Sequence, residues 1–167
     1  MIRILLIISF VSLFFVACST DNDDSMSVEG VWKLTEYNVS DGFDINGDGI
    51  KSTNLLDEID CENNEFLTFE SNGVMSSNLS FNPNILIALL DGTTDDYTFN
   101  VACDEEGVIG FAANYTQKGE TIIYNNHNAS IIGNQLYVAF KKAVKIYNES
   151  FTEVVKAKDL TLVYTKQ

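Results

Sequence analysis

The sequence predicts an all-β fold, an antiparallel up-and-down β-barrel of about eight strands. Two observations carry this prediction: apolar and polar residues alternate with a period of two over much of the chain after Gly30, and short turn sequences separate the alternating runs. The turn sequences are spaced as in consecutive hairpins, which produce an antiparallel meander. Such a sheet has to remove its free edges, and closure into a barrel does so.

The expected strands share a simple design in which alternate residues form one apolar face. In chain order these faces are Trp32 and Leu34; Tyr97, Phe99 and Val101; Ile109, Phe111, Ala113 and Tyr115; Leu136, Val138 and Phe140; and Leu160, Leu162 and Tyr164. The turn signals between strands are Ser71-Asn72-Gly73, Lys118-Gly119-Glu120, Asn125 to Asn128, and Ile132-Gly133-Asn134. Because glycine and asparagine tolerate the backbone of tight turns, these sequences favour hairpin connections.

One apolar segment departs from the alternation. It runs from Ile85 to Leu90 and is flanked by Asn82-Pro83-Asn84 and Asp91-Gly92. We expect a short helix or a buried loop that caps one end of the barrel. The alternative is a loop at the mouth that gates an apolar cavity or contacts a partner.

The N-terminus predicts export and lipid attachment. An uncharged, mainly apolar run from Ile4 to Ala17 follows Arg3, and it is too short for a spanning helix, which needs about 20 residues. Residues 1–17 are therefore expected to be a signal peptide. The sequence Phe15-Val16-Ala17-Cys18 resembles a bacterial lipobox, which implies acylation of Cys18 and anchoring without a transmembrane helix.

Residues 18–28 are expected to form an acidic, flexible tether, and residues 29–167 the barrel domain. The stretch from Ser19 to Asp24 is similar to the acidic export signal of surface lipoproteins in Bacteroidetes-type bacteria, although an ordinary solvated linker has the same composition. The expected location is the bacterial outer membrane with the domain on the cell surface, the periplasmic face being the alternative.

Charge and cysteine content narrow the function further. The 167 residues include 24 Asp and Glu against 10 Lys and Arg, a formal net charge of −14, so nucleic acid is excluded as a partner. Once Cys18 is acylated, Cys61 and Cys103 remain as an even pair in an oxidising compartment, and we expect them to form a disulfide. A metal pair or two free thiols are weaker alternatives, because no Cys-x-x-Cys or Cys/His spacing occurs.

A calcium site is expected in the first long loop, as a structural element. The sequence Asp44-Ile45-Asn46-Gly47-Asp48-Gly49 reproduces the start of a calcium-binding loop, in which alternate side-chain oxygens coordinate the cation. The ligands we expect are Asp44, Asn46, Asp48, the carbonyl of Ile50, and Asp57 or Glu58; Asp41 is a further candidate. An EF-hand has Glu at the twelfth position, where this chain has Leu55, and an acidic turn without metal is the alternative.

The opening Gly30-Val31-Trp32, followed by Leu34-Thr35, resembles the G-x-W start of lipocalins. With Phe66 to Phe69, Asn72-Gly73, Cys61, the loop from Asp44 to Gly49 and the closing strand from Leu160 to Tyr164, the domain resembles the lipocalin-like domain of Bacteroidetes lipoproteins. The resemblance implies a calyx of about eight strands and no particular activity.

The function expected is binding of a small apolar ligand inside the barrel. The inward residues expected to contact it are Trp32, Phe99, Phe111, Leu136 and Phe140. The same residues could instead fill the interior, which leaves a cell-surface structural or interaction module that meets another protein or a glycan as the alternative. We do not expect an enzyme, because the single His127 lies in a polar turn and no catalytic motif occurs; a hydrolase or isomerase is the weakest hypothesis.

Overall fold

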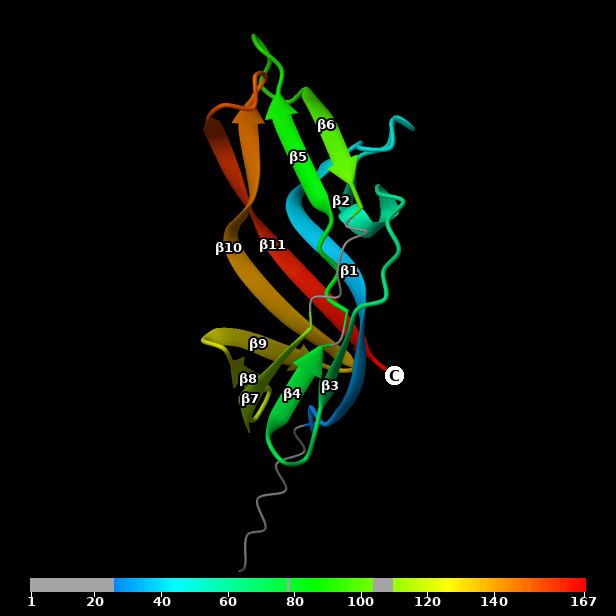
Figure 1. Ribbon diagram of the computed structural model, residues 1–167, viewed down its shortest axis with the longest axis vertical. Helices are drawn as coiled ribbons and strands as arrows, with labels where there is room; N and C mark the ends of the chain where they lie inside the picture. The colour runs from blue at the N-terminus through cyan, green and yellow to red at the C-terminus, as the bar shows by residue number, and fades with distance from the viewer. Residues whose placement is uncertain (1–25, 78, 104–109) are drawn as a thin grey trace, which may run out of the picture.

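Eight antiparallel strands form a closed barrel in up-and-down order, which confirms the predicted fold class. The computed structural model describes residues 26–77, 79–103 and 110–167 (Figure 1). The barrel strands follow one another around the barrel in the order of the sequence, and β11 pairs with both β10 and β1 to close it. These strands are β1 (Gly30–Phe43), β3 (Phe66–Phe69), β4 (Val74–Ser77), β7 (Phe111–Lys118), β8 (Thr121–Tyr124), β9 (His127–Ile132), β10 (Gln135–Asn148) and β11 (Val154–Lys166).

Predictions for residues 1–25 lie outside the described residues. These include the signal peptide, the acylated Cys18 and most of the tether; Ile109 also falls in an undescribed segment, 104–109. Val28, which we assigned to the end of the tether, is fully buried and accepts a hydrogen bond from Nε1 of Trp32 at its carbonyl, 2.6 Å away. The ordered core therefore includes Val28.

The turns lie where the sequence places them. Between β8 and β9, Asn125 and Asn126 have φ angles of 45° and 62°, the left-handed backbone of a two-residue hairpin turn. Asparagine tolerates this conformation better than most residues because its short amide hydrogen-bonds locally. The turns at residues 71–73, 119–120 and 133–134 connect β3 to β4, β7 to β8 and β9 to β10.

Three strands are long enough to continue beyond the barrel into an extension of the same sheet. In Figure 1, β1, β10 and β11 run most of the length of the molecule, with β5 and β6 beside their far ends. The shorter elements of this extension are β2 (Ser52–Asn54), the 3-10 turn η1 (Leu55–Asp57), β5 (Asn84–Leu89) and β6 (Tyr97–Ala102). The register of β10 against β11 shifts between Phe140 and Val144, where Lys142 has a φ of 53° and the Asp159 carboxylate accepts its backbone N–H.

The expectation of a helix or loop at residues 85–90 is wrong. Residues 84–89 form strand β5, which pairs parallel with β10 and antiparallel with β6. Ile87 and the adjacent Ala88 are both fully buried, so consecutive residues facing opposite sides of the sheet are covered. A strand buried on both faces shows a continuous apolar run instead of alternation.

The apolar interior is divided into two clusters. The barrel cluster includes Trp32, Leu67, Met75 and Leu136, all with at most 1% of their surface exposed. The second cluster lies in the extension and includes Phe43, Leu55, Ile87 and Ile146. Burial of these side chains supplies most of the driving force for closing the barrel and for docking β5 and β6 against the long strands.

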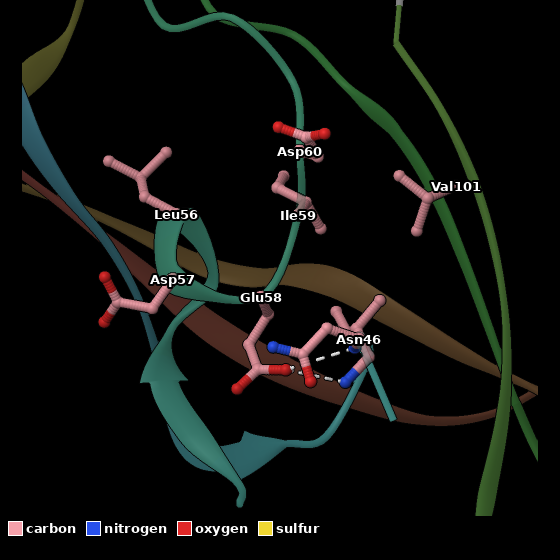
Figure 2. Close-up of a pocket in the computed structure, with 8 residues that line it drawn as sticks. Asn46, Leu56, Asp57, Glu58, Ile59, Asp60 and Val101 are labelled. Atoms are coloured by element: carbon pink, nitrogen blue, oxygen red, sulfur yellow. Dashed lines mark hydrogen bonds between the residues drawn. The ribbon is translucent and has the colours of Figure 1, made fainter. Parts of the chain in front are cut away.

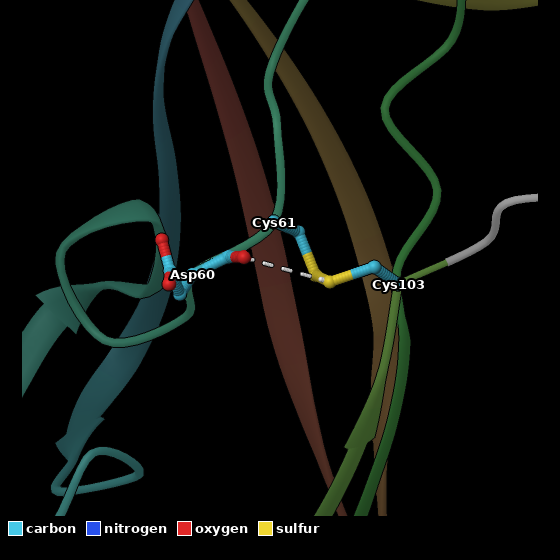
Figure 3. Close-up of a disulfide and its surroundings, with 3 residues drawn as sticks. All are labelled: Asp60, Cys61 and Cys103. Carbon is cyan, nitrogen blue, oxygen red and sulfur yellow. Dashed lines mark hydrogen bonds between the residues drawn. A yellow bond between two sulfur atoms is a disulfide. The ribbon is translucent and has the colours of Figure 1, made fainter.

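The predicted disulfide is confirmed. Cys61, in the loop after η1, is bonded to Cys103, which directly follows β6 (Figure 3), and their Cα atoms are 5.4 Å apart. The Sγ atom of Cys103 also lies 3.6 Å from the carbonyl oxygen of Asp60. Because the bond joins positions 42 residues apart, it restricts the unfolded chain and ties the loop preceding β3 to the extension.

Candidate functional site

A cavity of about 410 Å³ lies at the mouth of the barrel, at the end from which the long strands continue. Its walls are mainly apolar. Four barrel strands and one connecting segment supply the apolar side chains: Leu67 from β3, Phe111 from β7, Phe140 from β10, Leu162 from β11, and Phe81 from the segment between β4 and β5. Four ionisable side chains also line it, namely Glu65, Tyr124, His127 and Tyr164. An apolar hollow with a few converging polar groups is the usual form of a small-molecule site.

Glu65 is the most unusual of these residues, because it is a buried acid without a cationic partner. Only 5% of its surface is exposed. Its Oε1 accepts the Tyr164 hydroxyl at 2.5 Å and its Oε2 accepts the backbone N–H of Phe81 at 2.6 Å. The ion pairs among the described residues join Lys51 to Asp95, Lys141 to Asp159, and Lys158 to Asp41, and none includes Glu65.

The local electrostatics keep the phenols neutral and make the acid harder to ionise. Burial raises the pKa of the Glu65 carboxyl, while its hydrogen bonds from Tyr164 and Phe81 act in the opposite direction. Burial and the charge of Glu65 raise the pKa of Tyr124 to about 12, and the same two causes raise the pKa of Tyr164. Tyr164 therefore remains a hydrogen-bond donor to Glu65 at neutral pH.

The rim of the cavity is formed by the β8–β9 hairpin. His127 begins β9 and is exposed, as expected for a residue beside a polar turn. Its ring centroid lies 5.0 Å from that of Phe140 and 6.0 Å from that of Tyr124. The imidazole therefore stands at the entrance, next to two aromatic walls.

The structure brings two of the five expected ligand-contacting residues to the cavity. Phe111 and Phe140 line it. Trp32 and Leu136 are fully buried in the barrel cluster and do not line the cavity. Phe99 lies in β6, outside the barrel, with its ring 5.8 Å from that of Phe43 in the second cluster.

Sequence reasoning missed Glu65, although a signal was present. Glu65 precedes the strand Phe66–Phe69 and is in phase with Leu67 and Phe69, which are both buried. A period of two therefore places Glu65 on the inner face. A charged residue in phase with the apolar positions of a strand indicates a buried polar group, and such a group needs hydrogen-bond partners or a functional role.

A second hollow of about 510 Å³ borders the loop for which calcium was predicted (Figure 2). Glu58, 5% exposed, points toward the loop, where its carboxylate accepts the backbone N–H groups of Ile45 at 2.8 Å, Asn46 at 3.3 Å and Ser52 at 3.1 Å. In Figure 2, Asp57 and Asp60 point away from Glu58. Glu58 thus closes the loop through backbone hydrogen bonds.

The other expected calcium ligands also have donors from the loop itself. Asp44 Oδ2, Asn46 Oδ1 and Asp48 Oδ1 accept the backbone N–H groups of Gly49, Asp48 and Ile50, respectively. One oxygen, Asp44 Oδ1, is buried without a hydrogen-bond partner. In the part of the chain that the structure describes, no three His, Cys, Asp or Glu side chains are grouped so that they could hold a metal. Calcium needs six to eight oxygen ligands, and the described side chains are not grouped so that they supply them. The calcium site therefore stays a prediction.

Comparison with family models, curated proteins and solved structures found no match for this chain. Among the described residues, no helix is long and apolar enough to cross a membrane. The class defined by the fold and the site is therefore a closed eight-stranded β-barrel with a polar group buried in an aromatic mouth cavity.

The calcium prediction has a direct thermal test. If the loop binds calcium, the cation raises the melting temperature of the protein, and the Asp44→Ala/Asp48→Ala variant abolishes that rise. Glu29→Ala/Glu120→Ala removes the same charge from exposed positions of the barrel and should keep the rise. A wild-type melting temperature that is the same with calcium and with chelator would contradict the prediction.

Because the pKa of Glu65 is raised, we predict how the free energy of unfolding depends on pH. Because the folded state favours the neutral carboxyl, its contribution to stability is present below the ordinary pKa of 4.5 and is lost as the pH rises through the raised folded value. We expect Glu65→Gln to lose less unfolding free energy than wild type between pH 4.5 and neutral pH, as measured by urea titration. The exposed Glu120→Gln variant should retain the wild-type slope; an unchanged slope in Glu65→Gln would rule out ionisation of Glu65 as its cause.

Proposed function

We propose that this protein is a lipid-anchored, extracytoplasmic, lipocalin-like binding protein that takes a small, mainly apolar ligand into the mouth of its barrel. The observation that carries the proposal is the cavity of about 410 Å³, whose apolar walls are supplied by four barrel strands and the segment between β4 and β5. This volume lies within the usual range of small-molecule sites, about 300–1,000 Å³. Transfer of an apolar ligand from water to such walls is favourable.

The two halves of the barrel have different roles in this proposal. Toward the end where the chain enters, Trp32, Met75 and Leu136 are fully buried and the interior is filled by side chains. At the mouth, Phe111 and Phe140 are only partly buried and border the cavity. The filled half supplies a rigid base, so the ligand is confined to the mouth and is small.

The location in the proposal comes from the N-terminal sequence and is supported by the disulfide. Residues 1–17 and Cys18 have the pattern of an exported, acylated protein. The bond between Cys61 and Cys103 agrees with an extracytoplasmic location, because thiols are kept reduced in the cytosol of most bacteria.

An interaction module is the second candidate. The hairpin between β10 and β11 leaves Phe151, Val154 and Val155 38–46% exposed. Exposed apolar side chains grouped at a hairpin favour contact with another surface. This role would need no ligand in the barrel, so binding measurements separate the two candidates.

Binding of octanol tests the proposed function. All measurements use the Cys18→Ser protein, which cannot be acylated at Cys18 and so needs no detergent. We expect octanol to bind to the protein in isothermal titration calorimetry, because its chain fits an apolar cavity. Leu162→Trp, which places a larger ring in the cavity lining, should weaken octanol binding about tenfold or more. Leu89→Trp, a matched change in β5 outside that lining, should leave it unchanged. Absence of octanol binding to the parent protein, or equal loss in both variants, would contradict the proposal.

A further inference from the structure

The chemistry of the cavity narrows the class of ligand. From the buried, unpaired Glu65 carboxylate at the aromatic mouth, we infer that the ligand is an amphiphilic amine, whose ammonium group binds Glu65 and whose apolar body lies against the aromatic walls. This inference rests on the proposed function, since it assigns the polar end of the same ligand.

The hydrogen bonds to Glu65 match an ionised acceptor. Both carboxylate oxygens accept, one from the Tyr164 hydroxyl and the other from the Phe81 backbone N–H. An ionised carboxylate only accepts hydrogen bonds, and its two oxygens have about four acceptor positions, so two positions remain for a ligand. An ammonium group has three donors and no acceptor, which complements the remaining positions.

The charge of Glu65 has no counter-ion in the cavity. No lysine or arginine lines the described walls, and the lining groups that can ionise besides Glu65 are Tyr124, His127 and Tyr164. Burying a carboxylate without a cation costs free energy, and burial accordingly raises the pKa of the Glu65 carboxyl. A ligand cation that replaces the missing partner recovers part of that cost on binding.

The surroundings of Glu65 favour a cation over other polar groups. Rings from Phe81, Phe111, Tyr124 and Phe140 line the same cavity, and the faces of such rings attract ammonium groups. The net charge of −14 attracts cations to the protein. A fatty carboxylate would place a second negative charge beside Glu65, and an alcohol would leave the first one uncompensated.

The test compares three ligands with the same eight-carbon chain: octylammonium, octanol and octanoate. We expect octylammonium to bind the Cys18→Ser protein about tenfold or more tightly than octanol near pH 7 in calorimetry, and octanoate to bind more weakly than octanol. Glu65→Gln should bind octylammonium and octanol with similar affinity, while the exposed Glu120→Gln variant keeps the preference for octylammonium.

A salt titration of the parent protein makes the test independent of whether Glu65→Gln folds. The preference for octylammonium should persist in about 0.5 M NaCl, because a pair inside the cavity is screened less than a pair on the surface. Three results would each overturn the amine inference while leaving octanol binding and the proposed function intact. They are equal affinity for octylammonium and octanol, a preference for octylammonium that salt removes, and a preference for octylammonium that folded Glu65→Gln retains. If none of the three compounds binds, the proposed function fails as well.

Discussion

The mouth of the barrel depends on one buried carboxylate. Glu65 joins three separate parts of the chain, because it directly precedes β3 while its oxygens accept hydrogen bonds from Tyr164 on β11 and from the backbone of Phe81 between β4 and β5. The ring of Phe81 also packs edge-on against that of Tyr37, with the two ring centroids 5.7 Å apart. A buried charge is tolerated only where its hydrogen bonds are fixed, so Glu65 ties the start of β3 to β11 and to the segment that carries Phe81. Glu65 lines the cavity, and none of the ion pairs among the described residues includes it.

The extension makes the two ends of the barrel different and places the cavity at one of them. Strands β1, β10 and β11 are 13 or 14 residues long, whereas the other barrel strands have four to eight. The long strands therefore continue beyond one end of the barrel only, where β5 and β6 pack against them (Figure 1). The disulfide holds the loop that precedes β3 to this extension. The bulge at Lys142 allows β10 to change direction between the barrel and this extension. The cavity lies at this junction, beside short strands on one side and continuing strands on the other.

Much of the frame could be predicted from the sequence because it follows local rules. Alternation placed Trp32 and Leu34 inside, asparagine and glycine placed the hairpin turns, and counting cysteines paired Cys61 with Cys103. The failures have physical causes. Strand β5 is covered on both faces, which removes the alternation that identifies a strand. The position of Phe99 outside the barrel depends on a parallel pairing of β5 with β10, which local pattern does not specify. Glu65 carried a readable signal in its phase with Leu67, but its partner Tyr164 is 99 residues away, so their contact required the closed barrel.

The most direct test of the account is to locate a bound ligand by NMR. Isotope-filtered nuclear Overhauser measurements on labelled Cys18→Ser protein with unlabelled octylammonium report which side chains lie beside each part of the ligand. We expect contacts from the methylene next to nitrogen to the rings of Tyr164 and Tyr124, and contacts from the chain to Phe140. Contacts only to residues outside the cavity, such as Phe151 and Val154 on the β10–β11 hairpin, would contradict it.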